Sequence, residues 1–197
     1  MPARRSLLNR VPILLTGLRV LLAPAVVLLA LLAPLRAAFA LCLVAAFLSD
    51  VFDGVIARRF DVATPNLRRL DSFADSLFYG AATFAVWHLY PAAMSGRWFS
   101  LALLVALEMC RYGFDFMKFR RESSYHMWSS KAWGLTLFAS FFSLLALGSD
   151  NMFVDLAIYV GIASDLEGLA ISALLPTWRS DIPSLVHAWR LRESERL

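Results

Sequence analysis

Long apolar segments follow one another along this chain, and they restrict it to a membrane fold. Each holds roughly 20 mostly apolar residues, which is enough for a helix to cross a lipid bilayer. The sequence is 59% hydrophobic with a mean hydropathy of +0.63, well above an ordinary soluble domain. We therefore predict an all-α, polytopic integral membrane protein with about six transmembrane helices, at residues 11–34, 36–58, 70–91, 97–119, 128–148 and 152–175.

The basic residues predict how these helices are oriented, because Lys and Arg collect on the cytoplasmic side of membrane proteins. Six spans would place 15 of the 19 basic residues on one side. Arg36 and Arg97 would lie on the other side, and Arg19 and Arg111 lie inside spans. We predict an N-in, C-in, multi-pass protein of the cell (inner) membrane.

No long linker, repeat or low-complexity tract interrupts the chain, so we expect a single membrane domain over residues 1–197. Apolar residues and arginines mix after Pro176, which predicts a cytoplasmic amphipathic tail at 176–197. The net charge of +4 suits loops that face anionic lipid headgroups. We expect the lipid bilayer, and no nucleic acid, as a partner.

Four aspartates lie in segments that otherwise predict membrane helices: Asp50, Asp53, Asp71 and Asp75. A charged carboxylate in hydrocarbon costs several kcal/mol, so it needs a partner or a function. Asp50, Asp53, Gly54 and Ala57 follow a spacing that shares one helix face. Asp71 and Asp75 form an i, i+4 pair on the next helix.

The segment between these two helices is short, so we expect antiparallel helices whose acidic faces converge. Oxygen ligands without a nearby histidine favour Mg²⁺ or Mn²⁺ over zinc. Carboxylates from two helices are expected to hold two ions, an arrangement that clamps a phosphoryl group. Arg58 lies within reach of a phosphate as a bidentate donor.

The pattern Asp50-x-x-Asp53-Gly54-x-x-Ala57-Arg58, followed by Asp71-x-x-x-Asp75, resembles the signature of the CDP-alcohol phosphotransferases. These are integral-membrane enzymes that make phospholipids. The first apolar segment is also similar to the one that opens many members, at Asn9, Pro12, Thr16, Arg19 and Pro24.

This resemblance implies roles for the matching residues. Asp50, Asp53 and Asp71 would be the main metal ligands, and Asp75 would complete the site and act as general base. Gly54, Ala57 and Arg58 would line the pocket for CDP. The expected reaction moves a phosphatidyl group from CDP-diacylglycerol to an alcohol and releases CMP, near the cytoplasmic face. The family often forms homodimers, which implies one here.

The chain departs from the family pattern at one position. The family has a glycine four residues before the third aspartate, where this chain has Leu67. A leucine there predicts a changed fit of the cytidine or a changed donor.

The acceptor alcohol is expected to meet basic residues further along the chain, namely Arg111, Lys118, Arg121 and Lys131. These cations favour a phosphorylated acceptor such as glycerol 3-phosphate. Serine and inositol phosphate stay open as acceptors. Arg111 has a second interpretation, as the partner of Glu108 in a buried ion pair.

Other functions are compatible with intramembrane acids. A divalent-ion transporter also needs carboxylates within the bilayer, but it leaves the Gly54, Ala57 and Arg58 pattern unexplained. A catalytically silent membrane scaffold is a further alternative, in which the aspartates form an ion-pair network with nearby arginines. For Arg19, the sequence leaves a structural and a functional role equally open.

Overall fold

The computed structural model describes residues 2–60, 65–121, 125 and 127–194. Within these ranges, the side chains of residues 2–10, 57, 58, 65, 66, 68 and 194 lie outside the description. The described chain forms long helices and no β-strand, which confirms the predicted all-α membrane protein. It divides into two compact units, so the single domain expected over 1–197 stays a prediction.

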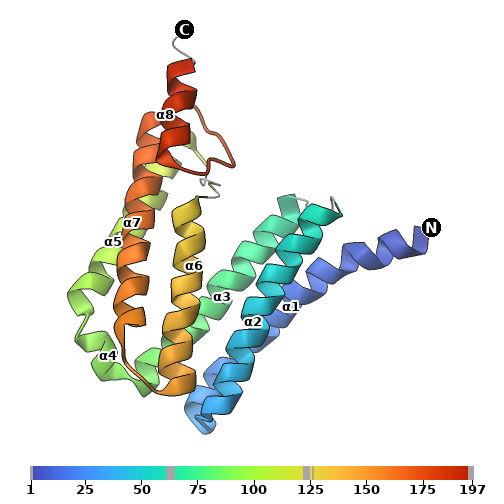
Figure 1. Cartoon of the computed structure of the whole chain (residues 1–197), viewed down its shortest axis with the longest axis vertical. Helices are drawn as coiled ribbons and strands as arrows, with labels where there is room; N and C mark the ends of the chain where they lie inside the picture. The colour runs from blue at the N-terminus through green and yellow to red at the C-terminus, as the bar shows by residue number, and fades with distance from the viewer. Residues whose placement is uncertain (1, 61–64, 122–124, 126, 195–197) are drawn as a thin grey trace. The chain divides into compact units, whose positions relative to one another are not determined.

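The first unit comprises Met1–Pro91 and Phe141–Ser149. Its elements are α1 (Pro2–Leu32), α2 (Arg36–Arg59), α3 (Pro65–Leu89) and the π-helix η1 (Phe142–Leu147). The helix α1 packs extensively against both α2 and α3, and η1 packs mainly against α2 (Figure 1). This arrangement makes α1 the element that connects the two aspartate-bearing helices.

The second unit comprises Ala92–Ser140 and Asp150–Leu197. Its elements are α4 (Pro91–Ser95), α5 (Trp98–Phe119), α6 (Trp128–Phe141), α7 (Met152–Leu174) and α8 (Leu185–Ser194). Polar contacts join α5 to α7 at similar sequence offsets, from Arg111 with Asp165 to Lys118 with Ser172. A near-constant offset means that α5 and α7 run parallel, as Figure 1 shows.

Local sequence explains where several of these helices begin and end. Pro34 lies in the three-residue connection between α1 and α2, where its missing N–H and its ring disfavour a continued helix. The side chain of Asn151 caps α7 by accepting a hydrogen bond from the Phe153 N–H at 3.1 Å. Gly148 ends η1 at a φ of 66°, a left-handed conformation that favours glycine.

Among the residues that the structure describes, four helical segments are long and apolar enough to cross a membrane: Val11–Leu32, Arg36–Ile56, Trp128–Leu147 and Met152–Leu174. They match four of the six predicted spans. The other two predicted spans, 70–91 and 97–119, correspond to the long helices α3 and α5. Each of these carries four charged residues among its 25 or 22 residues, so the count of six and the orientation stay predictions.

Small residues dominate the buried positions of the first unit. Ala74, Ala81, Ala82 and Ala85 of α3 are almost inaccessible. Within a membrane, lipid is as apolar as leucine, so helices associate through close packing that small side chains permit. The alanines therefore let the α3 backbone come close to the elements packed on it.

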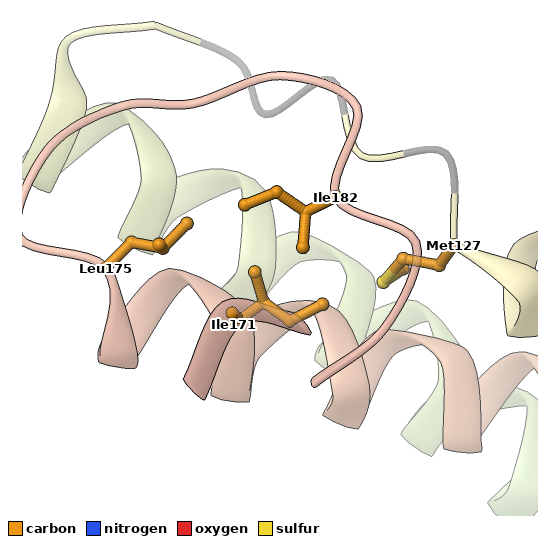
Figure 2. Packing of buried hydrophobic residues seen from close by; sticks show 5 residues of the cluster. Met127, Ile171, Leu175 and Ile182 are labelled. Carbon is orange, nitrogen blue, oxygen red and sulfur yellow. The ribbon is translucent and has the colours of Figure 1, made fainter. Parts of the chain in front are cut away.

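Larger apolar residues form the core around the C-terminal segment. Met127, Ile171, Leu175, Ile182 and Ala188 make a buried cluster, and Figure 2 shows it between α7 and the segment that leads to α8. The tail is helical over α8, and its Leu185 and Leu191 pack against this cluster. Val186 and Trp189 of the same helix remain exposed. The cytoplasmic amphipathic character of the tail stays a prediction.

Replacing Ala82 with leucine tests the packing of α3. Ala82 is fully buried, so we expect Ala82→Leu to destabilise the protein by about 1–3 kcal/mol through overpacking. Thr83→Leu is the matched control, because Thr83 is exposed on the same helix; it should change stability by less than about 0.5 kcal/mol. Thermal unfolding in detergent measures both, and equal effects would contradict the packing scheme.

Candidate active site

The two helices that carry the predicted motif present their acids to the same place. Asp50 and Asp53 lie one turn apart near the end of α2, and Asp71 and Asp75 lie one turn apart in the first half of α3. Each of Asp50, Asp53 and Asp71 offers an oxygen that lies within 4.8 Å of the other two. The predicted convergence of the two acidic faces is therefore present in the structure.

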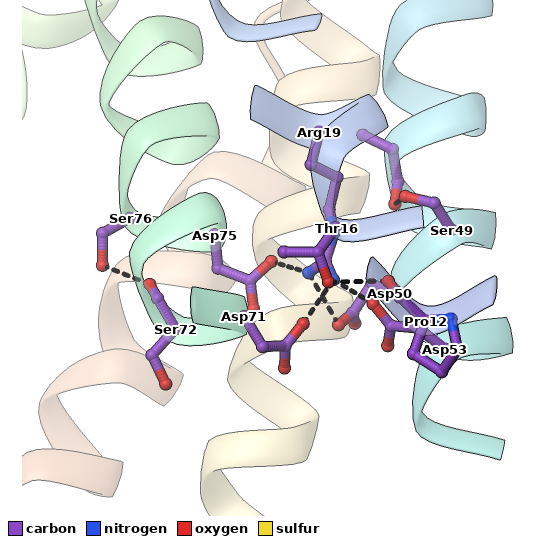
Figure 3. Close-up of polar contacts among 11 residues, drawn as sticks. Pro12, Thr16, Arg19, Ser49, Asp50, Asp53, Asp71, Ser72, Asp75 and Ser76 are labelled. Carbon is purple, nitrogen blue, oxygen red and sulfur yellow. Dashed lines mark hydrogen bonds and ion pairs between the residues drawn. The ribbon is translucent and has the colours of Figure 1, made fainter. Parts of the chain in front are cut away.

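A third helix completes the site with an arginine. Arg19 of α1 is only 1% exposed, and its guanidinium contacts all four aspartates, as Figure 3 shows. The distance from Nη1 of Arg19 to Oδ1 of Asp50 is 3.1 Å. Arg19 thus lies at the centre of the four acids. The sequence alone did not predict this, because it shows only an arginine within the first apolar segment.

The four acids differ in their access to solvent or lipid headgroups. The side chain of Asp53 is 6% exposed, whereas those of Asp50, Asp71 and Asp75 are 47%, 36% and 33% exposed. The site is therefore closed at Asp53 and open beside the other three.

The described ion pairs of this site join four carboxylates to one guanidinium. These five groups by themselves carry three more negative than positive charges when all are ionised. Helices of this apolarity give such an excess little solvation, so it calls for further cations. Oxygen ligands around one Mg²⁺ lie roughly 3–4 Å apart, a spacing that the converging oxygens of Asp50, Asp53 and Asp71 approach. The donor set therefore fits hard divalent cations.

A comparison with protein families agrees with the motif. The model of the CDP-alcohol phosphatidyltransferase family matches residues 9–166. The chain belongs to this family. Searches among curated proteins and solved structures gave no match. Membership makes it a membrane transferase of phospholipid biosynthesis, with a CDP-alcohol as its substrate.

The other residues expected to bind CDP in this family member follow the acids along α2. Gly54 comes directly after Asp53, and Ala57 and Arg58 lie in the last turns of the helix. The side chains of Ala57 and Arg58 lie outside the described part of the structure, so their predicted roles stay predictions. Leu67 lies one helical turn before Asp71, near the start of α3.

The four basic residues expected at the acceptor belong to the second unit, and each has a partner there. Arg111 donates through Nε to Oδ1 of Asp165 at 3.0 Å, which is closer than its 4.0 Å contact with Glu108. Lys118 donates to the carbonyl oxygens of Ser172 and Ala173. Arg121 and Lys131 lie over the rings of Trp178 and Trp128. Their role at an acceptor stays a prediction.

Neutralising one acid tests the charge imbalance. In the presence of a chelator, we expect Asp50→Asn to unfold at the same temperature as the unmodified protein or higher, because it removes one of the four negative charges that share the guanidinium of Arg19. Adding Mn²⁺ should stabilise the unmodified protein, by about 2.7 kcal/mol at 100 times the dissociation constant, and the variant by less. Thermal unfolding with and without Mn²⁺ measures this response.

The control for that experiment is Asp150→Asn in the second unit, where Asp150 pairs with Arg97 at 2.9 Å. This variant should keep the full response to Mn²⁺. A strong destabilisation by Asp50→Asn in chelator, with an unchanged response to Mn²⁺, would show that the acids are balanced without divalent cations.

Proposed function

We propose that this protein transfers a phosphatidyl group from CDP-diacylglycerol to the hydroxyl of a polar alcohol and releases CMP, with Mg²⁺ or Mn²⁺ at the aspartates. The observation that supports this best is the convergence of Asp50, Asp53 and Asp71 within 4.8 Å, in a chain of the CDP-alcohol phosphatidyltransferase family. The reaction takes place in the cell (inner) membrane, near its cytoplasmic face.

The carboxylates of Asp50, Asp53, Asp71 and Asp75 would hold two divalent ions. Such ions neutralise a diphosphate and stabilise the charge that develops on a leaving phosphate. Gly54, Ala57 and Arg58 would line the pocket for the CDP group. In this arrangement the guanidinium of Arg58 donates to phosphate oxygens, and the absent side chain of Gly54 gives the donor room.

Asp75 is the candidate general base. It contacts the same guanidinium as the other acids but is not one of the three whose oxygens converge within 4.8 Å. In the proposed step, the acceptor oxygen forms a bond to the phosphorus that carries diacylglycerol, the bond from that phosphorus to the oxygen of CMP breaks, and Asp75 takes the hydroxyl proton. The products are the new phospholipid and CMP.

The acceptor is proposed to be a phosphorylated alcohol, with glycerol 3-phosphate first and serine or inositol phosphate as alternatives. The cations Arg111, Lys118, Arg121 and Lys131 support this choice, since a phosphate would draw on them for charge-assisted hydrogen bonds. A homodimer is proposed on the family resemblance alone.

CMP release is the direct test of this function. Purified protein in lipid, given CDP-diacylglycerol and Mg²⁺, should release CMP only with one member of a panel of acceptor alcohols. We expect Asp71→Asn and Asp75→Asn each to lower the rate by at least about 10²-fold, the usual contribution of a general base or more.

Metal binding separates the two aspartates in the same experiment. Asp71→Asn should weaken Mn²⁺ binding more than Asp75→Asn does, because Asp71 is one of the three aspartates whose oxygens converge within 4.8 Å. Release of CMP that survives both substitutions would contradict the proposed site. Mn²⁺ flux into vesicles without any CMP release would favour the transporter instead.

Leu67 provides a test of donor fit. Its side chain stands where relatives have glycine, so we expect Leu67→Ala to lower KM for CDP-diacylglycerol several-fold with little change in kcat. Alanine keeps the helical propensity that glycine would lose, at about 1 kcal/mol. Leu70→Ala is the control, since Leu70 lies on the same helix at no predicted site position. A raised KM in Leu67→Ala would mean that leucine itself contributes to donor binding.

A further inference from the structure

The two terminal nitrogens of Arg19 divide the four aspartates between them. Its Nη1 contacts Asp50 of α2 and Asp75 of α3, and its Nη2 contacts Asp53 of α2 and Asp71 of α3. Each terminal nitrogen therefore joins one carboxylate from each helix (Figure 3). The two nitrogens occupy two bridging positions between α2 and α3.

These two positions are the ones that a pair of divalent cations would need. A cation that bridges the helices must contact oxygens from both, and the guanidinium contacts one oxygen of each of the four carboxylates. In chemical terms, the two N–H groups stand in for two bridging ions. The guanidinium and the ions compete for the same four carboxylates, because positive charges held this close together repel one another.

The burial of Arg19 also distinguishes it from an arginine in an ordinary surface ion pair. The side chain is 1% exposed, and its Nε has no hydrogen-bond partner among the described residues. A buried N–H without a partner costs free energy. The four carboxylates thus determine where the guanidinium lies, and the Nε–H of Arg19 is left without a hydrogen bond among the described residues.

We propose that Arg19 is a built-in counter-cation that holds the four aspartates together while divalent ions are absent, and that it competes with those ions for the site. This inference rests on the proposed metal-dependent function. It makes divalent binding an exchange, in which the guanidinium leaves the carboxylates as the ions enter. Arg19 then positions the four aspartates before divalent ions bind, and it lowers the affinity of the site for those ions.

The sign of one measurement tests this inference. Mn²⁺ is titrated into chelator-treated protein in lipid, and free Mn²⁺ is followed by electron paramagnetic resonance. We expect Arg19→Gln to bind Mn²⁺ at least about tenfold more tightly than the unmodified protein, because a competing positive charge is gone. The same variant should unfold at a lower temperature in chelator, with a smaller difference in saturating Mn²⁺.

Arg19→Lys keeps the charge but supplies a single ammonium, which cannot occupy both bridging positions. It should bind Mn²⁺ several-fold more tightly than the unmodified protein, and it carries the test if Arg19→Gln does not fold. Arg97→Gln is the matched control, because it removes an arginine that pairs with Asp150 and Asp155 in the second unit. Its Mn²⁺ affinity should equal that of the unmodified protein.

The possible failures are distinguishable. Equal or weaker Mn²⁺ binding in both Arg19 variants would overturn the inference and leave the proposed metal site intact, with Arg19 organising the ligands. If neither the unmodified protein nor any variant binds Mn²⁺, the metal-dependent function falls, and the inference falls with it.

Discussion

The meeting of four carboxylates at one guanidinium, between three apolar helices, is the constraint on which the first unit depends. Asp50, Asp53, Asp71 and Asp75 share the guanidinium of Arg19. Several acids this close repel one another, and an apolar surrounding increases that repulsion. The packing of α1 between its two partners is what brings a cation into their midst. A structure without α1 at this place would leave the two acidic pairs facing each other without the guanidinium of Arg19.

Two features of the packing hold α1 in this place: small side chains along α3, and buried residues at regular spacings along α1. Thr16, Arg19, Ala23, Val26 and Ala30 are all buried, at alternating spacings of three and four residues that follow one helix face. The polar end of this series is the site, and the apolar remainder is ordinary helix packing. One helix face therefore serves both the stability of the unit and the chemistry of its site, so changes in the packing are expected to reach the carboxylates.

The fold class and the convergence of the aspartates were both predictable from the sequence, because both depend on local patterns. Twenty-residue apolar runs and an i, i+3 or i, i+4 spacing of aspartates are local properties, and a helix converts local spacing directly into a face. Arg19 was harder, because a single arginine in an apolar segment is compatible with pairing inside its own helix. Its partners lie 31 to 56 residues away, and no local pattern specifies which distant helix an arginine will meet. The basic residues further along the chain illustrate the same limit, since Arg111 prefers Asp165 to the neighbouring Glu108.

The sequence by itself determined that this protein is helical, that it belongs in a membrane, and that two helices each carry a pair of aspartates on one face. These features follow from backbone geometry and from the cost of placing charge in hydrocarbon. Only the tertiary structure decided that α1 contributes the central cation, and that its two terminal nitrogens each bridge α2 to α3. The physical reason is that charge balance is a property of the assembled site: it depends on which side chains meet across helices, and that is settled by packing.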